Sequence, residues 1–362
     1  MEDIRFKKPV FPVQDPLRKY LLHANRELNV QISYQDLLRF SNAITLFDRF
    51  GNDTLWETLI YTESDRREIY EALFHIYAQM KVGGDTSVIE HLYVDRVDLC
   101  LYANTHPVRV RIVNRLNDLF DYFYIKRADA SRIYGMELEH FLSPNKINFL
   151  VSNNTLIEEH IQGIPGESFI KTHLRKDDYN PLRLAKEFVK FNERCFVQLL
   201  GDVRRDNFVV EVVPDFDEIY FRLRAIDFDQ QCYEGNVKIY LPQFFRENNP
   251  IIQLGFGLMT PVLELQYQRE ERTRIAKRIK SSQNELKSLL GAMQEDQLSS
   301  HENIERLKNE LADIYEDEEF LHCRTMGEIV STSLVMVHRY PVRPRIKVKP
   351  KPFSSDEETS KK

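Results

Sequence analysis

The apolar and polar positions in the first 80 residues mostly follow the pattern of amphipathic helices. Apolar residues recur at helical spacing over 37–44, and a longer series with the same spacing runs from Ile69 to Met80. Residues three and four positions apart lie on one face of a helix, so each series would bury one side. Gly83 and Gly84 end the second series, since glycine commonly follows a last helical turn. We therefore predict a helical segment over residues 1–87.

From residue 88 onward, apolar and polar residues alternate, which is the pattern of β-strands. The predicted elements are strands at 91–102, 108–113 and 119–126, a helix at 131–142, and strands at 147–152 and 155–161. Turn residues separate them, and a Gly-Ile-Pro-Gly stretch closes the region at 163–166. The order is therefore three strands, one helix and two strands.

The next region mixes helices with one further pair of strands. The predicted elements are a helix at 181–200, a polar loop at 201–207, and a hairpin with strands at 208–213 and 219–226. After residue 229 the pattern becomes helical again. The tail at 344–362 is rich in Lys, Pro, Ser and Glu, a composition typical of disorder.

Residues 262–316 are highly charged and carry apolar residues at heptad-like spacing in two segments. A break at 296–300 makes a helical hairpin the expected structure. This hairpin could be an arm that binds a protein partner or caps a substrate. It could equally be a pair of amphipathic helices that pack on their own domain.

Composition excludes several classes of protein. The chain has 362 residues and a net charge of −6, which argues against a nucleic-acid coat protein. It has no run of about 18 uncharged apolar residues, and its start lacks the apolar stretch of a secretory signal. The four cysteines are isolated, and the histidines show no metal-ligand spacing. We therefore expect a cytoplasmic protein with buried thiols and no membrane contact, for which nucleic acid is an unlikely partner.

The candidate catalytic and metal-binding residues lie in one polar stretch of the chain. Asp202 and Asn207 lie five positions apart in the loop before the hairpin, and Asp227 ends the returning strand. Transfer of a phosphoryl group from ATP requires one carboxylate that orients the acceptor hydroxyl. It also requires oxygen ligands that hold magnesium against the phosphates.

These residues resemble two motifs of the protein-kinase-like superfamily, in its aminoglycoside phosphotransferase and small-molecule kinase branch. That branch carries a His-Gly-Asp-x-x-x-x-Asn loop and an Ile-Asp-Phe/Trp-Asp/Glu motif. The matching stretches here are 200–207, read Leu-Gly-Asp with Asn five residues later, and 226–229, read Ile-Asp-Phe-Asp. The resemblance implies that Asp202 is the catalytic base and that Asn207 and Asp227 hold Mg²⁺.

The upstream half is similar to the same branch in the same order. The stretch ending in Lys126 resembles the third-strand lysine motif, which implies contact with nucleotide phosphates. The following helix offers Glu137 or Glu139 as the ion-pair partner of that lysine, and Glu137 is favoured. Residues 156–162 resemble the hinge between lobes. The resemblance implies that the backbone of this hinge binds adenine, through Glu159, His160 and Ile161.

Three features depart from the motifs, one of which is the short spacing of 11 residues between Lys126 and Glu137. Leu200 stands where the branch has histidine, and the turn at 103–107 contains no glycine, although phosphate loops are usually glycine-rich. The resemblance covers about residues 88–235, becomes looser to about 340, and is absent from 1–80. These departures keep a kinase-like protein without catalysis as an alternative.

Together these features predict an α+β, bilobal protein-kinase-like fold. The small lobe at 88–163 would hold an antiparallel five-stranded sheet and one helix. The larger, mostly helical lobe at 164–343 would include the hairpin at 262–316. The expected function is ATP- and Mg²⁺-dependent phosphorylation of a hydroxyl on a small molecule. The alternative is a pseudokinase or scaffold that acts through protein contacts of the 262–316 helices.

Overall fold

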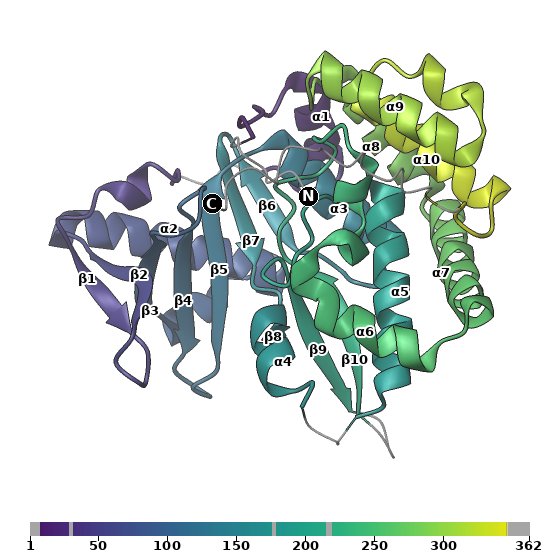
Figure 1. The fold of residues 1–362 in the computed structure, drawn as a ribbon. Coiled ribbons are helices and arrows are strands. Elements are labelled where there is room, and N and C mark those ends of the chain that lie inside the picture. The colour runs from purple at the N-terminus through teal and green to yellow at the C-terminus, as the bar shows by residue number, and fades with distance from the viewer. Residues whose placement is uncertain (1–7, 29–31, 176–178, 215–218, 345, 347–362) are drawn as a thin grey trace, which may run out of the picture.

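A computed structural model describes residues 8–28, 32–175, 179–214, 219–344 and 346. The chain forms an α+β structure in which a mostly antiparallel sheet lies beside a group of helices and a smaller sheet (Figure 1). The predicted hairpin turn at 215–218 lies outside the described residues. So does the predicted tail, apart from residues 344 and 346.

The larger sheet contains the predicted order of three strands, one helix and two strands. Its strands are β1 (Asn42–Phe47), β2 (Asp53–Ile60), β3 (Leu92–Cys100), β4 (Val108–Asn114), β5 (Phe120–Arg127), β6 (Phe149–Ser152) and β7 (Thr155–Glu159), and α3 (Ala130–Leu142) follows β5. Neighbouring strands are antiparallel, in the order β1-β2-β3-β4-β5-β7-β6. The five strands and the helix predicted between residues 88 and 163 are confirmed.

The prediction of a wholly helical segment over 1–87 is wrong for residues 42–60. The helices of this segment are α1 (Asp15–His23), the short 3₁₀ helix η1 (Asp36–Leu38) and α2 (Glu63–Val82). Between them β1 and β2 form a hairpin, which makes the described sheet seven-stranded rather than five-stranded. The turn is set by Gly51, which has φ of 81°, and by Asp48, whose carboxylate accepts the Phe50 and Asn52 N–H groups. Pairing of Trp56 with Cys100 then outweighs the local helical spacing.

Helix α2 covers one face of this sheet. Thr62 caps its start, and Gly83, with φ of 64°, ends it. The apolar side of α2 packs on alternate residues of β4 and β5 to form one hydrophobic cluster, whose members include Ile69, Leu73, Ile76, Val110, Phe123 and Ile125. Because successive side chains of a strand point to opposite faces, Tyr124 and Lys126 lie on the face that α2 does not cover.

The helical part and the smaller sheet, together with α3 and parts of β6 and β7, build a second hydrophobic cluster. The predicted hairpin forms the last two strands of the smaller sheet, which has three strands in the order last, middle, first along the chain. The strands are β8 (Ile164–Pro165), β9 (Phe208–Pro214) and β10 (Ile219–Ala225); the helices are α4 (Gly166–Thr172), α5 (Pro181–Gln198), α6 (Asn249–Leu258), α7 (Pro261–Ser281), α8 (Gln283–Glu295), α9 (His301–Tyr315) and α10 (Met326–Arg339). The remaining 3₁₀ helices are η2 (Thr86–His91), η3 (Val237–Tyr240), η4 (Pro242–Phe244), η5 (Arg246–Asn248) and η6 (Glu318–His322).

The region 262–316 holds α7, α8 and α9 rather than the two helices of a hairpin, and it packs on its own part of the molecule. Helix α7 lies against α5 and α10, and α8 lies against α1 and α10 (Figure 1). The apolar positions of these helices, among them Ile275, Leu286, Met293 and Leu307, are buried in the second cluster. The heptad-like spacing therefore reflects internal packing.

All four cysteines are buried free thiols, as the sequence indicates. Within the described part of the chain, none of the helices combines the length and the apolar character needed to span a membrane.

Candidate functional site

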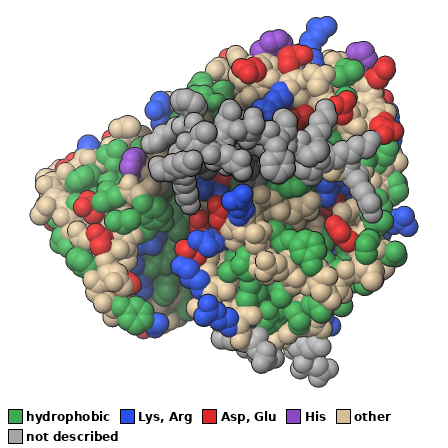
Figure 2. Space-filling view, in the orientation of Figure 1, with side chains coloured by type: hydrophobic (Ala, Val, Ile, Leu, Met, Phe, Trp, Pro, Cys, Tyr) green, Lys and Arg blue, Asp and Glu red, His purple; other side chains and the backbone are tan. Residues whose placement is uncertain are grey.

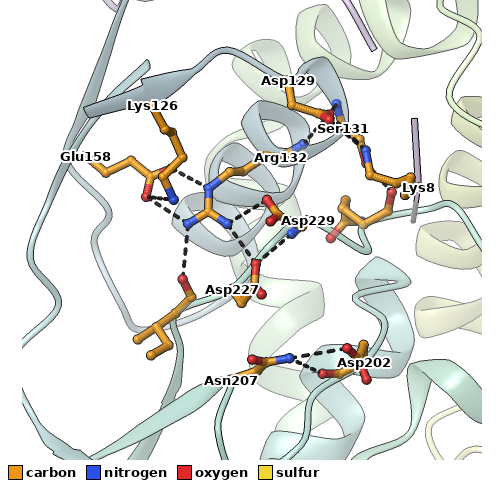
Figure 3. Close-up of polar contacts among 12 residues, drawn as sticks. Lys8, Lys126, Asp129, Ser131, Arg132, Glu158, Asp202, Asn207, Asp227 and Asp229 are labelled. Atoms are coloured by element: carbon orange, nitrogen blue, oxygen red, sulfur yellow. Dashed lines mark hydrogen bonds and ion pairs between the residues drawn. The ribbon is translucent and has the colours of Figure 1, made fainter. Parts of the chain in front are cut away.

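Residues from distant parts of the chain meet between the larger sheet and the helical part (Figure 3). Lys126 comes from β5, Glu158 from β7, and Arg132 from the first turn of α3. Asp227 and Asp229 follow the end of β10. Figure 2 shows a recess between the two parts of the molecule, with hydrophobic and Lys or Arg side chains along it.

Arg132 is the centre of this cluster. Its Nε and Nη2 atoms donate to the two oxygens of Glu158, with Nη2 at 2.8 Å. Its Nη1 atom donates to Oδ1 of Asp227 at 2.8 Å and to Oδ1 of Asp229 at 2.9 Å. Nη2 also reaches the carbonyl oxygen of Ile226 at 3.2 Å. The side chain is 5% exposed, so these bonds lie largely out of solvent.

The start of α3 is fixed so that Arg132 points at this cluster. Asp129 caps the helix, and its carboxylate accepts the N–H groups of Ser131 and Arg132. Lys8 pairs with Asp129 at 2.8 Å, and the Ser131 hydroxyl donates to the carbonyl oxygen of Gln231 at 2.5 Å. The N-terminal segment and the chain after Asp229 therefore both hold the first turn in place.

Lys126 pairs with Glu158 rather than with a glutamate of α3. Its Nζ atom lies 3.2 Å from Oε2 of Glu158. Lys126 is opposite Leu156 in the ladder, and Glu158, two residues further along β7, shares the same face. Although burial raises the pKa of Glu158, the charges of Arg132 and Lys126 bring it below its usual value. Glu158 is thus an anion shared by two cations.

The predicted pairing of Lys126 with Glu137 or Glu139 is wrong. Glu137 accepts hydrogen bonds from Tyr20 and Arg26, each at 2.9 Å. Glu139 instead accepts from Asn145 at 2.9 Å and from Gln198 at 2.8 Å. Both glutamates lie later in α3, where the helix is enclosed by other elements, whereas its first turn is the part that reaches the Lys126 cluster.

The loop with Asp202 is held beside the residues that follow β10. The Gly201 N–H donates to the Gln230 carbonyl at 3.2 Å, and a Cβ atom on Gly201 would lie only 2.9 Å from that oxygen. Leu200, in the histidine position of the motif, is fully buried and bridges to Gln231. Close backbone packing, with no imidazole, thus fixes the loop.

Asp202 and Asn207 interact within this loop. The Asn207 Nδ2 atom donates to the Asp202 carbonyl oxygen at 2.7 Å, and the Arg204 Nε atom lies 2.9 Å from Oδ1 of Asp202. Burial raises the pKa of Asp202 to about 6, with Arg204 opposing the shift and Asp227 adding to it. Burial and the charge of Asp229 also raise the pKa of Asp227, against the opposing charge of Arg132. Asp202 and Asp227 are therefore close enough to sense each other's charge.

The predicted hinge residues lie at the end of β7. The Glu159 N–H donates to the Asn148 carbonyl and the His160 N–H to the Tyr122 carbonyl, both at 3.0 Å. These two backbone groups are therefore already hydrogen-bonded within the protein. Ile161 follows them and is half-buried. A cavity of about 210 Å³ beside them is lined by Phe120, Asp121, Tyr122, Glu159, His160 and Gln162.

Aromatic and arginine side chains extend the site across the uncovered face of the sheet. The Arg109 guanidinium lies 4.2 Å from the centre of the Trp56 ring. Arg109 also binds the buried carboxylate of Asp98 through Nη2 at 2.8 Å. The Trp56 ring lies 6.4 Å from that of Tyr124, which is two residues before Lys126 on the same face. This face continues directly to the lysine.

The structure thus brings four of the predicted residues together, namely Lys126, Asp202, Asn207 and Asp227. Glu137 and Glu139 lie elsewhere, and the predicted hinge residues directly follow Glu158 at the end of β7. Sequence reasoning missed Arg132 and Glu158. A basic residue in the first turn of a helix opposes the helix dipole, which is the signal that could have drawn attention to Arg132.

The oxygen atoms at this site suit a hard cation. Magnesium prefers oxygen ligands and uses few protein groups, a description that fits Asp227 and Asn207. Burial, and after it the charge of Asp229, raise the pKa of Asp227 despite the opposing charge of Arg132. Within the described residues, however, no group of three or more His, Cys, Asp or Glu side chains is arranged to hold a metal ion.

In comparisons with known proteins, no family model matches the chain, and no curated protein matches it.

Proposed function

We propose that this protein is an ATP- and Mg²⁺-dependent phosphotransferase that phosphorylates a hydroxyl group of a small molecule. Its fold would be the bilobal protein-kinase-like fold, with the lobes at 88–163 and 164–343. The observation that carries the proposal is that three separate segments, β5 with Lys126, the loop with Asp202 and Asn207, and the end of β10 with Asp227, lie at one junction. These residues belong to three different sequence motifs, so none of the motifs alone would place all four side chains at the same junction.

Each side chain has a defined task in this proposal. Asp202 would orient the acceptor hydroxyl and take its proton as the new phosphorus–oxygen bond forms and the bond from the γ-phosphorus to ADP breaks. With a pKa of about 6, Asp202 is mostly ionised at neutral pH and is a stronger base than an ordinary aspartate. Lys126 would stabilise negative charge on the phosphates. Asn207 and Asp227 would hold magnesium, which supplies positive charge against the phosphate oxygens.

The choice of a small acceptor rests on the resemblance to the small-molecule kinase branch. A fold hosts many functions, so the acceptor must be found by experiment. Screening a set of sugars, amino alcohols and nucleosides for ADP release with this protein and Mg·ATP would identify it.

A kinase-like protein without catalysis is the second candidate, and the Arg132 contacts favour it. Arg132 binds the carboxylates of Asp227 and Asp229, and the N–H groups of Glu159 and His160 are used within the sheet. The apolar residues of the 262–316 helices are largely buried, which weakens their role as a partner surface. Near the start of that region, however, Phe256 and Val262 are 83% and 74% exposed, so a partner could contact this end.

Thermal unfolding in the presence of Mg·ATP tests the nucleotide site on which the proposal depends. A ligand at about 100 times its dissociation constant adds about 2.7 kcal/mol to the free energy of unfolding. The phosphotransferase proposal predicts a rise in the melting temperature of the wild type and none in Asp227→Ala. A folded wild-type protein that shows no rise would contradict the nucleotide site.

A further inference from the structure

Arg132 has an unusual place for a buried cation. It lies in the first turn of α3, where the helix dipole is unfavourable for positive charge. Its burial is made possible by the carboxylates of Glu158, Asp227 and Asp229. With the adjacent Lys8–Asp129 pair included, four carboxylates face three cations, Arg132, Lys126 and Lys8. The cluster therefore keeps an excess of negative charge even with the arginine in place.

The contacts of Arg132 fall into two groups. Nε and Nη2 form a fork with both oxygens of Glu158, a geometry that is strong and directional. Nη1 alone reaches Asp227 and Asp229, through Oδ1 of each. The bonds of Nη1 can therefore be exchanged while Glu158 continues to anchor the guanidinium.

Nη1 occupies Oδ1 of Asp227, one of the two residues that the proposed function gives to magnesium, and Oδ1 of the neighbouring carboxylate of Asp229. A guanidinium carries donors and no acceptor, so it cannot share these lone pairs with a metal ion. We propose that Arg132 competes with the divalent cation for Asp227 and Asp229 and so acts as a positioning residue that disfavours metal binding without nucleotide. This inference rests on the metal that the proposed function requires.

This competition would couple the binding of the metal ion to the binding of the nucleotide. Once nucleotide phosphates are present, Nη1 has a new acceptor, and the carboxylates become available to the cation. Coupling between two ligands is reciprocal, so the metal and the nucleotide each raise the affinity for the other. Arg132 would then contact phosphate beside Lys126 while still held by Glu158.

Binding of Mn²⁺ alone, without nucleotide, tests this inference. Free Mn²⁺ is measured by electron paramagnetic resonance during titration of the wild type, Arg132→Gln and Arg204→Gln. Arg204 is the matched control, because its Nε lies 2.9 Å from Asp202 and its removal changes the net charge equally. Arg132→Gln should bind Mn²⁺ about tenfold more tightly, within the usual range of a coupling free energy. Arg204→Gln should differ from the wild type by less than about threefold, as expected for a partly exposed charge.

A purely structural role for Arg132 predicts the opposite, because loss of its bonds would disorder the carboxylates and weaken Mn²⁺ binding. Arg132→Lys is a second variant in case Arg132→Gln does not fold. Lysine keeps the positive charge but cannot form the two-bond contact with Glu158, so its increase in Mn²⁺ affinity should be smaller than that of Arg132→Gln. Unchanged or weaker binding in these variants, or an equal gain in Arg204→Gln, would overturn the inference.

The assay contains no ATP, so its result is independent of phosphotransfer. Tighter Mn²⁺ binding in a protein that transfers no phosphate would support the competition and count against the proposed function. Phosphotransfer by the wild type, without tighter Mn²⁺ binding in Arg132→Gln, would support the proposed function and count against the competition.

Discussion

Lys126 and Glu158 are ion-paired across two neighbouring strands, with 3.2 Å between Nζ and Oε2. Because Glu158 also binds Arg132 through both oxygens, one buried carboxylate sets the position of both cations. The lysine of the site is therefore positioned by the sheet itself, with no contribution from the glutamates of α3.

Substitution Glu158→Gln should destabilise the protein and weaken nucleotide binding. The amide keeps the size of the side chain but leaves Lys126 and Arg132 without their shared anion. Loss of one partner from a buried ion pair costs about 3–5 kcal/mol, and the remaining bonds of Arg132 to Asp227 and Asp229 should hold the loss to about 2–4 kcal/mol. Urea unfolding measures it.

Glu159→Gln is the matched control for Glu158→Gln. Glu159 is the next residue along β7 and pairs with Lys81 where its side chain is 30% exposed. A partly exposed pair contributes less than about 1 kcal/mol. Equal losses in the two variants would contradict the central position of Glu158.

The stability of Asp202→Asn should depend less on pH than that of the wild type. The folded-state pKa of Asp202 is raised to about 6 from 3.8, so the folded protein binds this proton more tightly than the unfolded chain. The wild type therefore loses stability as pH rises from about 4 to about 6, by up to roughly 3 kcal/mol from this group. The asparagine side chain of the variant cannot ionise, so the variant should avoid that loss.

Melting temperatures of the wild type and Asp202→Asn, measured between pH 4 and pH 7.5, check this prediction. The variant should gain stability relative to the wild type as pH rises. A constant difference across the range would mean that Asp202 titrates alike in the folded and unfolded states.

Gly201→Ala should distort the Asp202 loop. The added Cβ would lie 2.9 Å from the Gln230 carbonyl oxygen and 3.0 Å from the Ile239 Cγ2 atom. Such overpacking costs about 1–3 kcal/mol. An added Cβ on Gly291 in α8 would meet nothing within 4 Å beyond its chain neighbours and the backbone of its own helix, so Gly291→Ala should be neutral or stabilising by up to about 1 kcal/mol. Calorimetry of both variants tests the difference, and equal effects would refute close packing at Gly201.

Trp56 should report on nucleotide binding, because it is the only tryptophan in the chain and lies on the sheet face that continues to Lys126. Addition of Mg·ATP should change its fluorescence in the wild type and leave Asp227→Ala unchanged. A signal unaltered by saturating nucleotide would place the nucleotide away from this face.

Much of the fold could be predicted from local pattern. The strands after residue 88 alternate clearly, and the helix between them is bounded by Asp129 and Pro144, so their order was readable. The β1–β2 hairpin was missed because its short apolar runs fit either period. Pairing of Trp56 with Cys100 of β3, a contact distant in sequence, decided the outcome.

The site was partly predictable for a similar reason. Asp202, Asn207 and Asp227 lie in recognisable loops, whereas the partner of Lys126 depends on strand register. Only the pairing of Lys126 with Leu156 places Glu158 on the same face. Arg132 was missed because its three carboxylate partners lie 26, 95 and 97 residues away.

The most direct test of the central claim is phosphoryl transfer itself. Purified protein is incubated with Mg·ATP and the acceptor set, and ADP and phosphorylated product are quantified for the wild type and for Asp202→Asn. The account predicts product with the wild type and a rate at least about 100-fold lower in the variant, since a general base contributes about 10²–10⁴-fold. Equal rates in both proteins, or no product from a folded wild type that binds Mg·ATP, would contradict it.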